Sequence, residues 1–502
     1  MIVILSLFLI PGLAGGFCLV SRRVAVCRHI LWIIGLLHFI MVVWCWLHRP
    51  LPITSSWIGL DDTGLLFLSI VSLLFLGSSI YVFGYMGVED MESRKDLKED
   101  ILFKNSNNSI FTGCLLLFLS TMTLVTVSRH LGLMWVAIEA TTLSSAPLIY
   151  YHRHHRSLEA VWKYLLICSV GIALAMLGNF FIVVAGSNVG AHGVHLSLND
   201  LTIHAKELNP VWLKAAFVFC LVGYGTKMGL APMHNWLPDA HSEAPSAVSA
   251  LLSGALLNCA FLVLLRVHTI MIAAGLGSTS RGLFVLLGLI SLIFAAVFII
   301  GQPDFKRMLA YSSVEHMGII ALGVGIGGIG VFGSMFHAIN HSLTKALLFM
   351  AAGNIMTAYK TKESDRVRGL IYTRPLTALL WLAGGVAIIG SPPFGTFLSE
   401  LTILGAMIDS GRYWIAVIYL LFLGIIFAAL SAKILPMVFS RPSEDNCAGF
   451  SEKSLAPSRS SEPAWSVIPL AVFGTGGLIL GLYMPPWLSK ILHGITLCLG
   501  VQ

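Results

Sequence analysis

The sequence predicts an all-α polytopic membrane protein with about 14 transmembrane helices, arranged as two inverted five-helix repeats that each contain a broken helix. Of its 502 residues, 57% are hydrophobic and 11% are charged, and the mean hydropathy is +0.86. Soluble domains carry about 25% charged residues. The hydrophobic residues suffice for roughly 14 spans of about 20 residues each. This composition excludes a soluble enzyme, a nucleic-acid-binding domain and a disordered protein.

Apolar stretches long enough to cross a membrane recur along the whole chain. They fall at 2–20, 29–47, 64–87, 109–128, 130–150, 163–186, 211–236, 247–271, 282–301, 314–329, 331–357, 375–408, 413–436 and 465–487. The predicted organisation is three N-terminal helices, a first five-helix repeat, a second repeat, a flexible cytoplasmic loop, and a C-terminal helix with a tail, at 1–108, 109–271, 282–436, 437–464 and 465–502.

The basic residues predict how the chain is oriented. Loops that follow odd-numbered spans hold nineteen Lys and Arg, whereas loops that follow even-numbered spans hold six. Because basic loops stay in the cytoplasm, the odd-numbered loops are expected there. This orientation puts both termini on the outer side of the membrane. The expected location is a bacterial inner membrane, in which that side is periplasmic.

The cysteines indicate no cofactor. None of the nine Cys forms a Cys-x-x-Cys pair, and most lie inside apolar stretches, which favours a packing role. We therefore expect no cofactor, no metal and no active site of its own in this chain.

Charged residues lie deep within the apolar stretches. Glu139 and Glu400 are the acids, and Lys227 and Lys345 are the bases. A charge at the centre of a membrane helix costs about 3 kcal/mol, so four of them need a reason. One explanation is internal ion pairs that hold the bundle together; the other is a relay of titratable groups that passes protons. Lys163, at the start of its stretch, is a further candidate for the relay.

Helix-breaking residues accompany two of these charges. Gly and Pro surround Lys227 in LVGYGTKMGLAPMHNWLPDAH, and they precede Glu400 in LAGGVAIIGSPPFGTFLSE. Interrupted apolar stretches in corresponding positions of two halves point to an ion path. Lys227 and Glu400 are 173 residues apart, as are the starts of the fourth and ninth stretches. Spans 4–8 and 9–13 are therefore interpreted as two copies of one unit.

The eleventh stretch contains His337, His341 and Lys345, spaced by four residues and hence near one helix face. A proton wire is one interpretation. A metal pair from His-x-x-x-His is another, although no third ligand is evident. Haem ligation would need facing histidines on two helices.

Four motifs carry a resemblance to a known family: GTKMGLAPMHNWLPDAHSEAPSAVSALLSGALLN, DFKRMLAYSSVEHMG, HAINHSLTKALLF and SPPFGTFLSE. The chain resembles, over roughly 60–440, the antiporter-like proton-translocating membrane subunits of complex I, Mrp antiporters and membrane-bound hydrogenases. Within this family it is most similar to the F component of type-four, formate hydrogenlyase-like, hydrogenases.

The resemblance implies a hydrophilic axis along the membrane midplane. By this resemblance, Glu139 matches the glutamate of the fifth helix, and Lys227 matches the lysine of the broken seventh helix. Lys345, with His341 and His337, matches the central polar residues of the eleventh helix, and Glu400 matches the acid of the broken twelfth. The first two are the pair proposed to couple proton loading to switching. Family members bind no redox centre themselves, because partner subunits carry the nickel–iron, flavin or iron–sulfur chemistry.

One position departs from the family pattern. Several relatives carry a lysine in the eighth helix where this chain has Asn258, and Asn does not titrate. Ordered water around Asn258 or the nearby His234 would then bridge the gap, or the main route runs through the second half. His316, four residues after the repeat equivalent of Glu139, is a further auxiliary candidate.

These features lead to one expected function with alternatives. The chain is expected to be a proton-translocating membrane subunit of a redox complex of the hydrogenase or formate hydrogenlyase type, related to NADH:quinone oxidoreductase. Expected partners are the lipid bilayer, sister membrane subunits, a peripheral redox arm with nickel–iron and iron–sulfur centres, and protons or Na⁺, but no nucleic acid. The alternatives are an Mrp-type cation/proton antiporter subunit, the membrane partner of a zinc protein in proton-driven inorganic carbon uptake, and a structural anchor.

Overall fold

The structure is a computed structural model that describes residues 2–21, 23–49, 57–88, 94–95, 102–103, 105–187, 194–440 and 462–500. This part of the chain is helical apart from two short antiparallel strands, β1 (Arg94–Lys95) and β2 (Leu102–Phe103), and isolated bridges. Twelve of its helices are long and apolar enough to cross a membrane. The predicted class, an all-α polytopic membrane protein, is confirmed. Most of the predicted loop at 437–464 lies outside the described residues.

The N-terminal third of the bundle comprises α1 (Ile2–Val20), α2 (Val24–Leu47), α3 (Asp62–Val88), α4 (Asn108–Val127), α5 (Leu131–Ile149) and α6 (His155–Ala185). The middle comprises α7 (Leu198–Ile203), η1 (Ala205–Glu207), α8 (Pro210–Met228), α9 (Trp236–Glu243), α10 (Ser246–Leu251), the π-helical η2 (Leu252–Leu256) and α11 (Leu257–Ala273). The remainder comprises α12 (Gly277–Ile299), α13 (Phe305–Ile326), α14 (Ile329–Tyr359), η3 (Ser364–Arg366), α15 (Leu370–Thr373), α16 (Pro375–Ile388), α17 (Gly395–Asp409), α18 (Tyr413–Phe439), α19 (Ala464–Leu482) and α20 (Pro486–Gly500).

Fourteen spans were predicted, two more than these twelve, and the remaining two fall on α14 and on α16 with α17. The 31-residue α14 is long enough to cross, but the polar residues along its buried length lower its hydropathy. The 14-residue α16 spans only about 21 Å at 1.5 Å per residue, less than the roughly 30 Å of hydrocarbon in a bilayer. A crossing at this place therefore requires α16 and α17 together, and these two spans stay a prediction.

Three predicted boundaries were wrong. The sixth stretch was expected from 163, but α6 begins at His155. The tenth stretch was expected at 314–329, but α13 begins at Phe305, because polar residues such as Lys306 hide its first turns from hydropathy. Lys306 lies buried there, and its ammonium group donates to the carbonyl of Ala244. The last stretch was expected as one helix to 487, but α19 ends at Leu482 and a separate α20 begins at Pro486.

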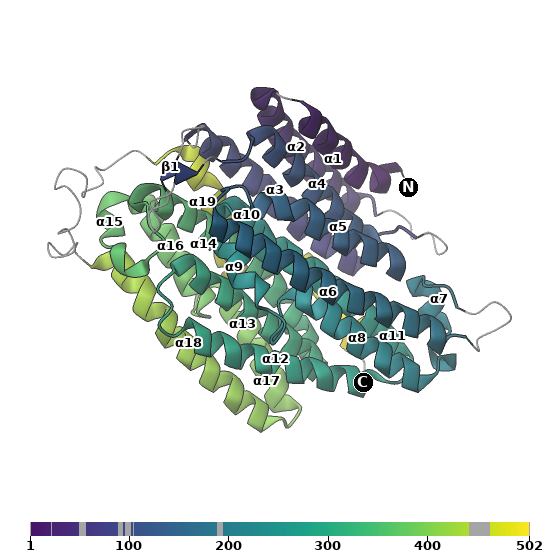
Figure 1. The fold of residues 1–502 in the computed structure, drawn as a ribbon. Coiled ribbons are helices and arrows are strands. Elements are labelled where there is room, and N and C mark those ends of the chain that lie inside the picture. Colours follow the sequence, from purple (N-terminus) through teal and green to yellow (C-terminus); the bar gives the residue numbers. More distant parts are fainter. Residues whose placement is uncertain are drawn as a thin grey trace.

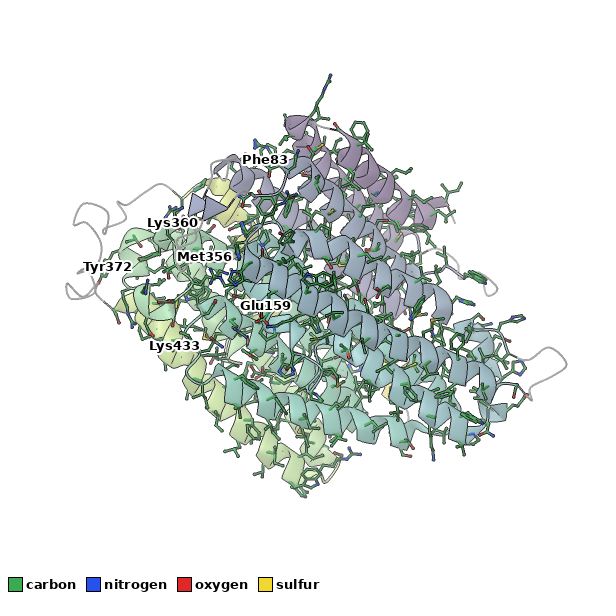
Figure 2. The ribbon with its side chains drawn as sticks, in the orientation of Figure 1. Phe83, Glu159, Met356, Lys360, Tyr372 and Lys433 are labelled. Atoms are coloured by element: carbon green, nitrogen blue, oxygen red, sulfur yellow. The ribbon has the colours of Figure 1, made fainter. Side chains whose placement is uncertain are left out.

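The loops separate into two sets at opposite ends of the bundle (Figure 1). Isolated β-bridges join loops of the same set. The pairs Asn105–His152 and Asp304–Glu363 lie between loops that follow odd-numbered spans, and the pairs Ile58–Ser128 and His130–Ser197 lie between loops that follow even-numbered spans. Figure 2 shows Lys360, Tyr372 and Lys433 at the end where the odd-numbered loops lie. The alternation is what helices crossing a membrane in turn require.

Both five-helix units have the same order of elements, with the fourth span broken in each. In the first unit, α8 ends and α9 begins after a seven-residue interval at 229–235; in the second, α16 and α17 are separated by 389–394. The predicted broken helices are confirmed. The inverted relation between the two units stays a prediction.

A buried arginine joins three segments at the even-loop end. Arg266 of α11 donates to the carbonyl oxygens of Val125 (3.1 Å), Thr126 (2.9 Å) and Ser128 (2.6 Å) and to Asp61 Oδ1 (2.9 Å). Burial by itself would raise the pKa of Asp61, but the Arg266 guanidinium holds that pKa below its ordinary value. The pair therefore stabilises the fold at neutral pH.

Replacing Asp61 by asparagine is expected to lower the free energy of unfolding at pH 7 by ~1.5 kcal/mol, because a hydrogen bond to a charged group is lost. This free energy is the lowest expected for a hydrogen bond to a charged group, because the Asp61 side chain is 35% exposed and water screens the pair. Because the folded-state pKa is lowered, the stabilisation is present above the ordinary pKa of about 3.9 and lost as the pH falls below it. Thermal unfolding in detergent at pH 7 and pH 3 measures this.

Asp62→Asn is the matched control. Asp62 pairs with Arg49 at the surface, where both side chains are about half exposed, and such pairs contribute about 0.2–1 kcal/mol. If Asp61→Asn and Asp62→Asn lowered the free energy of unfolding at pH 7 by equal amounts, the role assigned to Asp61 would be contradicted.

Candidate functional site

The first cluster surrounds Lys227, the last residue but one of α8. Its Nζ donates to Thr142 Oγ1 of α5 (2.8 Å) and to Tyr164 Oη of α6 (2.6 Å). It also lies 4.4 Å from the centroid of the Tyr164 ring, a cation–π distance. Tyr164 Oη is 2.6 Å from Ser145 Oγ, so the hydroxyl chain continues along α5. Within the described part of the chain, the fully buried ammonium group of Lys227 has neutral partners and no salt bridge.

Glu139 lies on α5 beside an opening of about 300 Å³ that is lined by Trp135, Ser169, Ile172, Ala173, Met176, Leu177 and Phe180. Its Oε1 accepts a hydrogen bond from Ser169 Oγ at 3.0 Å. Among the described residues, its Oε2 is buried without a partner. The pair that the family resemblance implies, Glu139 with Lys227, is therefore not a direct ion pair in this structure.

Lys345 forms the centre of the second cluster, on α14. Its Nζ donates to the carbonyl of Leu309 (2.7 Å) and to Ser312 Oγ, both on α13. Glu315, one turn further along α13, lies within electrostatic range of Lys345. All three polar side chains are almost completely buried.

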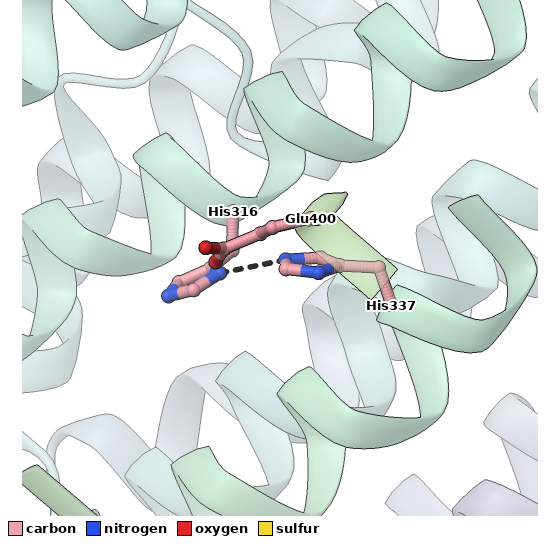
Figure 3. Close-up of side chains that lie close together, drawn as sticks. All are labelled: His316, His337 and Glu400. Atoms are coloured by element: carbon pink, nitrogen blue, oxygen red, sulfur yellow. Dashed lines mark hydrogen bonds between the residues drawn. The ribbon is translucent and has the colours of Figure 1, made fainter. Parts of the chain in front are cut away.

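Next to Lys345, histidines from two helices meet an acid from a third (Figure 3). His316 Nδ1 of α13 and His337 Nε2 of α14 are 2.7 Å apart, and His337 Nδ1 is 2.8 Å from Ser399 Oγ of α17. A carboxylate oxygen of Glu400 lies within 4.8 Å of nitrogens of both histidines. The ring of His341 lies 5.1 Å from that of His316, centroid to centroid. These contacts form a buried chain of titratable groups between α13, α14 and α17.

The break between α16 and α17 makes room for the Glu400 carboxylate. Gly390, in this break, has φ +66° and faces the carboxylate so closely that a Cβ there would lie 1.9 Å from Oε2. Only glycine combines this backbone conformation with the space the carboxylate occupies. The helix breakers noticed in the sequence therefore hold the acid in place.

Gly390→Ala is expected to lower the free energy of unfolding by about 1–3 kcal/mol, the cost of a non-glycine residue at positive φ, and to displace the Glu400 carboxylate. Gly405→Ala on α17 is the control: nothing lies within 4 Å of its Cβ position, so it should stabilise the helix by about 0.5–1 kcal/mol. Thermal unfolding of both variants measures this, and a harmless Gly390→Ala would contradict the packing described.

Hydrogen bonds connect the two halves of the bundle where η2 and the start of α11 meet α13 and α14. Asn258 Nδ2 donates to Ser342 Oγ (2.7 Å) and to the carbonyl of Gly254 (2.9 Å), and Ser253 Oγ is 2.8 Å from Ser313 Oγ. Single π-turns are frequent at functional sites. Asn258 thus occupies a buried, hydrogen-bonded position between the halves.

Comparison with known proteins identifies the family. The family model described as NADH:quinone oxidoreductase/Mrp antiporter, transmembrane region, matches residues 128–426, more than half of the chain. The chain belongs to this family. The prediction from the four motifs is thereby confirmed.

Named relatives are hydrogenase and quinone oxidoreductase subunits. The hydrogenase-4 component F homolog of Methylacidiphilum infernorum is 39% identical over 65% of this chain and 68% of its own length. Hydrogenase-4 component B of Escherichia coli is 29% identical over 70% of this chain, which spans only 51% of that relative. NADH-quinone oxidoreductase subunit N of Desulforudis audaxviator is 28% identical over 72% of this chain and 71% of its own length.

Solved structures share the fold. A chain of the archaeal membrane-bound sulfane sulfur reductase superimposes with a TM-score of 0.85 at 22% identity, over 99% of this chain and 97% of that one. A chain of the Mrp complex from Dietzia gives 0.83 at 18% identity, with the same coverage.

The structure brings five of the ten predicted site residues of this antiporter-like chain together. His316, His337, His341, Lys345 and Glu400 form one cluster, which we call the histidine cluster. The roles predicted for its members in a relay stay predictions.

Two predicted residues lie elsewhere. Lys163 is 45% exposed and forms salt bridges with Glu159 (2.6 Å) and Asp239 (2.9 Å), apart from the buried groups. His234 lies in the break after α8, with its ring 5.6 Å from Phe294 and 6.3 Å from Tyr311, centroid to centroid. Neither contacts Lys227 or Lys345 in the described structure.

Sequence reasoning missed three groups in the site. Glu315 was not counted among the intramembrane charges because the tenth stretch was started at 314, which put this acid at a helix end. Tyr164 looked like one more aromatic residue in an apolar stretch. His241 of α9 is fully buried, with its ring 6.2 Å from Trp236 and 5.5 Å from Phe349, on the path from Lys227 towards Lys345. Its place in the LPDAH motif was the available signal.

Proposed function

We propose that this chain carries protons along the line of buried polar groups from Lys227 to Glu400, as a membrane subunit of a redox complex of the hydrogenase type. The observation that carries the proposal is the histidine cluster inside an apolar bundle. There, His316 and His337 of two helices are hydrogen-bonded to each other, and the Glu400 carboxylate of a third helix lies within 4.8 Å of both. The names of the relatives, hydrogenase-4 components and quinone oxidoreductase subunits, support a redox complex.

Proton transfer within the second half follows the short contacts. The hydrogen bond between His316 and His337 lets one proton be shared and passed between the rings. Glu400 accepts it on the α17 side, and Lys345 supplies charge from the α14 side. Because Lys345 is held by a carbonyl and a hydroxyl rather than by a tight ion pair, a change in its charge alters the field on the histidines.

The first half acts through Lys227 and its hydroxyl partners. When Lys227 is charged, Thr142, Tyr164 and the Tyr164 ring stabilise it. When it loses a proton, Glu139 is the acid of this half that accepts one; its carboxylate is bonded to Ser169 in an otherwise largely apolar opening. The Asn258–Ser342 contact and His241 connect this half to the second. The single amide of Asn258 conducts no proton itself, so His241 is the titratable group at the junction.

We infer that the chain lies in a bacterial inner membrane with the odd-numbered loops in the cytoplasm and both termini on the periplasmic side. The concentration of Lys and Arg at one end of the bundle supports this orientation. The expected partners are sister membrane subunits and a peripheral arm with nickel–iron and iron–sulfur centres. Na⁺ in place of H⁺ is the alternative substrate.

A second candidate function is cation/proton exchange in an Mrp-type assembly. The likeness to the Mrp chain, with a TM-score of 0.83, favours it. Both functions use the same buried groups, so the partners decide between them.

Purification of the chain in mild detergent, followed by mass spectrometry of the proteins that accompany it, tests the assignment. We expect a hydrogenase-like large subunit with iron–sulfur proteins. Sister antiporter subunits without any metalloprotein would establish the Mrp-type function instead, and a zinc protein as sole partner would contradict both.

A further inference from the structure

We propose that His316, His337 and Glu400 form a binding site for one divalent first-row cation, of the class of Zn²⁺ or Co²⁺. The three side chains come from α13, α14 and α17, and they present nitrogen and carboxylate ligand atoms within 4.8 Å of one another. Figure 3 shows the two imidazole rings and the carboxylate converging on one point. Two imidazoles and a carboxylate, with a fourth position open, are a donor set that suits such cations.

The hydrogen bonds around His337 leave the lone pair of its Nε2 free to bind a cation. The Ser399 hydroxyl donates to the carbonyl of Thr396 (2.8 Å), so it accepts from His337 Nδ1–H (2.8 Å). His337 is therefore protonated at Nδ1, and its Nε2 lone pair faces His316. Histidine ligands of metals are oriented in this way, by a hydrogen bond from the second ring nitrogen.

A second ligand lone pair becomes available when one proton of His316 moves from Nδ1 to Nε2. Its Nδ1–H now donates to His337 Nε2 at 2.7 Å. When the proton shifts to Nε2, which is buried and has no hydrogen-bond partner among the described residues, Nδ1 becomes a second lone pair. Neither imidazole loses a proton overall, and the Glu400 carboxylate binds in its ionised form. The two nitrogens then separate to ~3.3 Å, as two bonds of ~2.0 Å at a tetrahedral angle require.

His341 is placed to supply the fourth ligand. Its ring lies 5.1 Å from the His316 ring, centroid to centroid, and both of its nitrogens are buried; among the described residues they have no side-chain partner, and only the backbone of Ser253 lies near one of them. Orphaned buried nitrogens are costly unless a ligand or water satisfies them. The His-x-x-x-His pair, His337 and His341, thus gains His316 and Glu400 as further ligands from neighbouring helices.

A cation at this position replaces the proton shared by His316 and His337. Under the proposed function it therefore blocks proton transfer through the second half, and this consequence alone rests on that proposed function. Metal binding itself is independent of it.

Equilibrium dialysis of the purified full-length chain, in its complex, against Co²⁺ tests the site. We expect one bound Co²⁺ per chain with the visible absorption of tetrahedral Co²⁺. The absorption should be lost in His337→Gln and Glu400→Gln and kept in His268→Gln, which changes a buried histidine bonded to Ser280. Ser399→Ala, which removes only the partner of His337 Nδ1, should weaken binding about 10–100-fold.

X-ray absorption of the Zn²⁺-loaded wild-type protein keeps the test decisive if a variant does not fold. Imidazole scattering with ligand distances of ~2.0–2.1 Å is the expected result. Absence of stoichiometric binding, or an absorption spectrum unchanged in the His337 and Glu400 variants, would overturn the proposal. A protein that binds Co²⁺ here but moves no protons would refute the proposed function and leave the metal site standing.

Discussion

Replacing Lys227 by methionine is expected to reduce proton translocation by about 100-fold or more while the redox partners still turn over, because removing a group that exchanges protons costs about that factor. Methionine is one heavy atom shorter than lysine and removes the charge, so the fully buried site between α5, α6 and α8 stays largely filled. Thr142 and Tyr164 lose a cation but no packing neighbour. The measurement is a pH-sensitive dye in proteoliposomes that contain the purified complex.

Lys214→Met is the control for this substitution. Lys214 lies on the same helix, α8, but is exposed. Its replacement should leave translocation within the scatter of the wild type. Equal translocation in the Lys227 and Lys214 variants would remove Lys227 from the pathway.

The second large effect is expected for Glu400→Gln. Glutamine has nearly the shape of glutamate and fits the space beside Gly390, but it neither accepts nor releases a proton. Because the carboxylate lies beside both histidines of the pair, we expect translocation to fall by about 100-fold or more. Redox turnover of the partners should persist in part, since they carry the electron-transfer chemistry. Asp409→Asn, at the exposed end of α17, is the matched control.

Glu400→Asp separates the chemical role from the structural one. Aspartate keeps the titratable group but withdraws it by one methylene. Partial recovery of translocation relative to Glu400→Gln is expected. If Glu400→Gln pumped as well as the wild type, the acid would be only a packing residue.

Much of the fold followed from hydropathy, because lipid demands long apolar helices and tolerates few exceptions. The exceptions were informative. Lys227, Lys345 and Glu400 stood out against apolar neighbours, and the structure buries all three. The helix breaks beside two of them were visible as Gly and Pro. The start of α13 was missed because its polar residues face protein, and hydropathy does not distinguish lipid from a protein interior.

The arrangement of the site could not be predicted, because it depends on contacts between helices distant in the sequence. His316 and His337 meet only because α13 packs on α14, and Ser399 joins them from α17. Nothing in a single sequence gives the register of those helices. Lys163 shows the converse: it stood at the start of an apolar stretch and was a candidate for the relay, but α6 begins eight residues earlier and places it in a surface ion network.

The proposed function requires protons to cross the membrane through this chain. The decisive measurement is the number of protons translocated per electron transferred, in proteoliposomes with the wild-type complex and with a complex that carries Lys227→Met and Glu400→Gln together. We predict a proton signal coupled to redox turnover in the wild type, and electron transfer without it in the double variant. An unchanged ratio in the double variant, or wild-type turnover with no proton signal, would contradict the account.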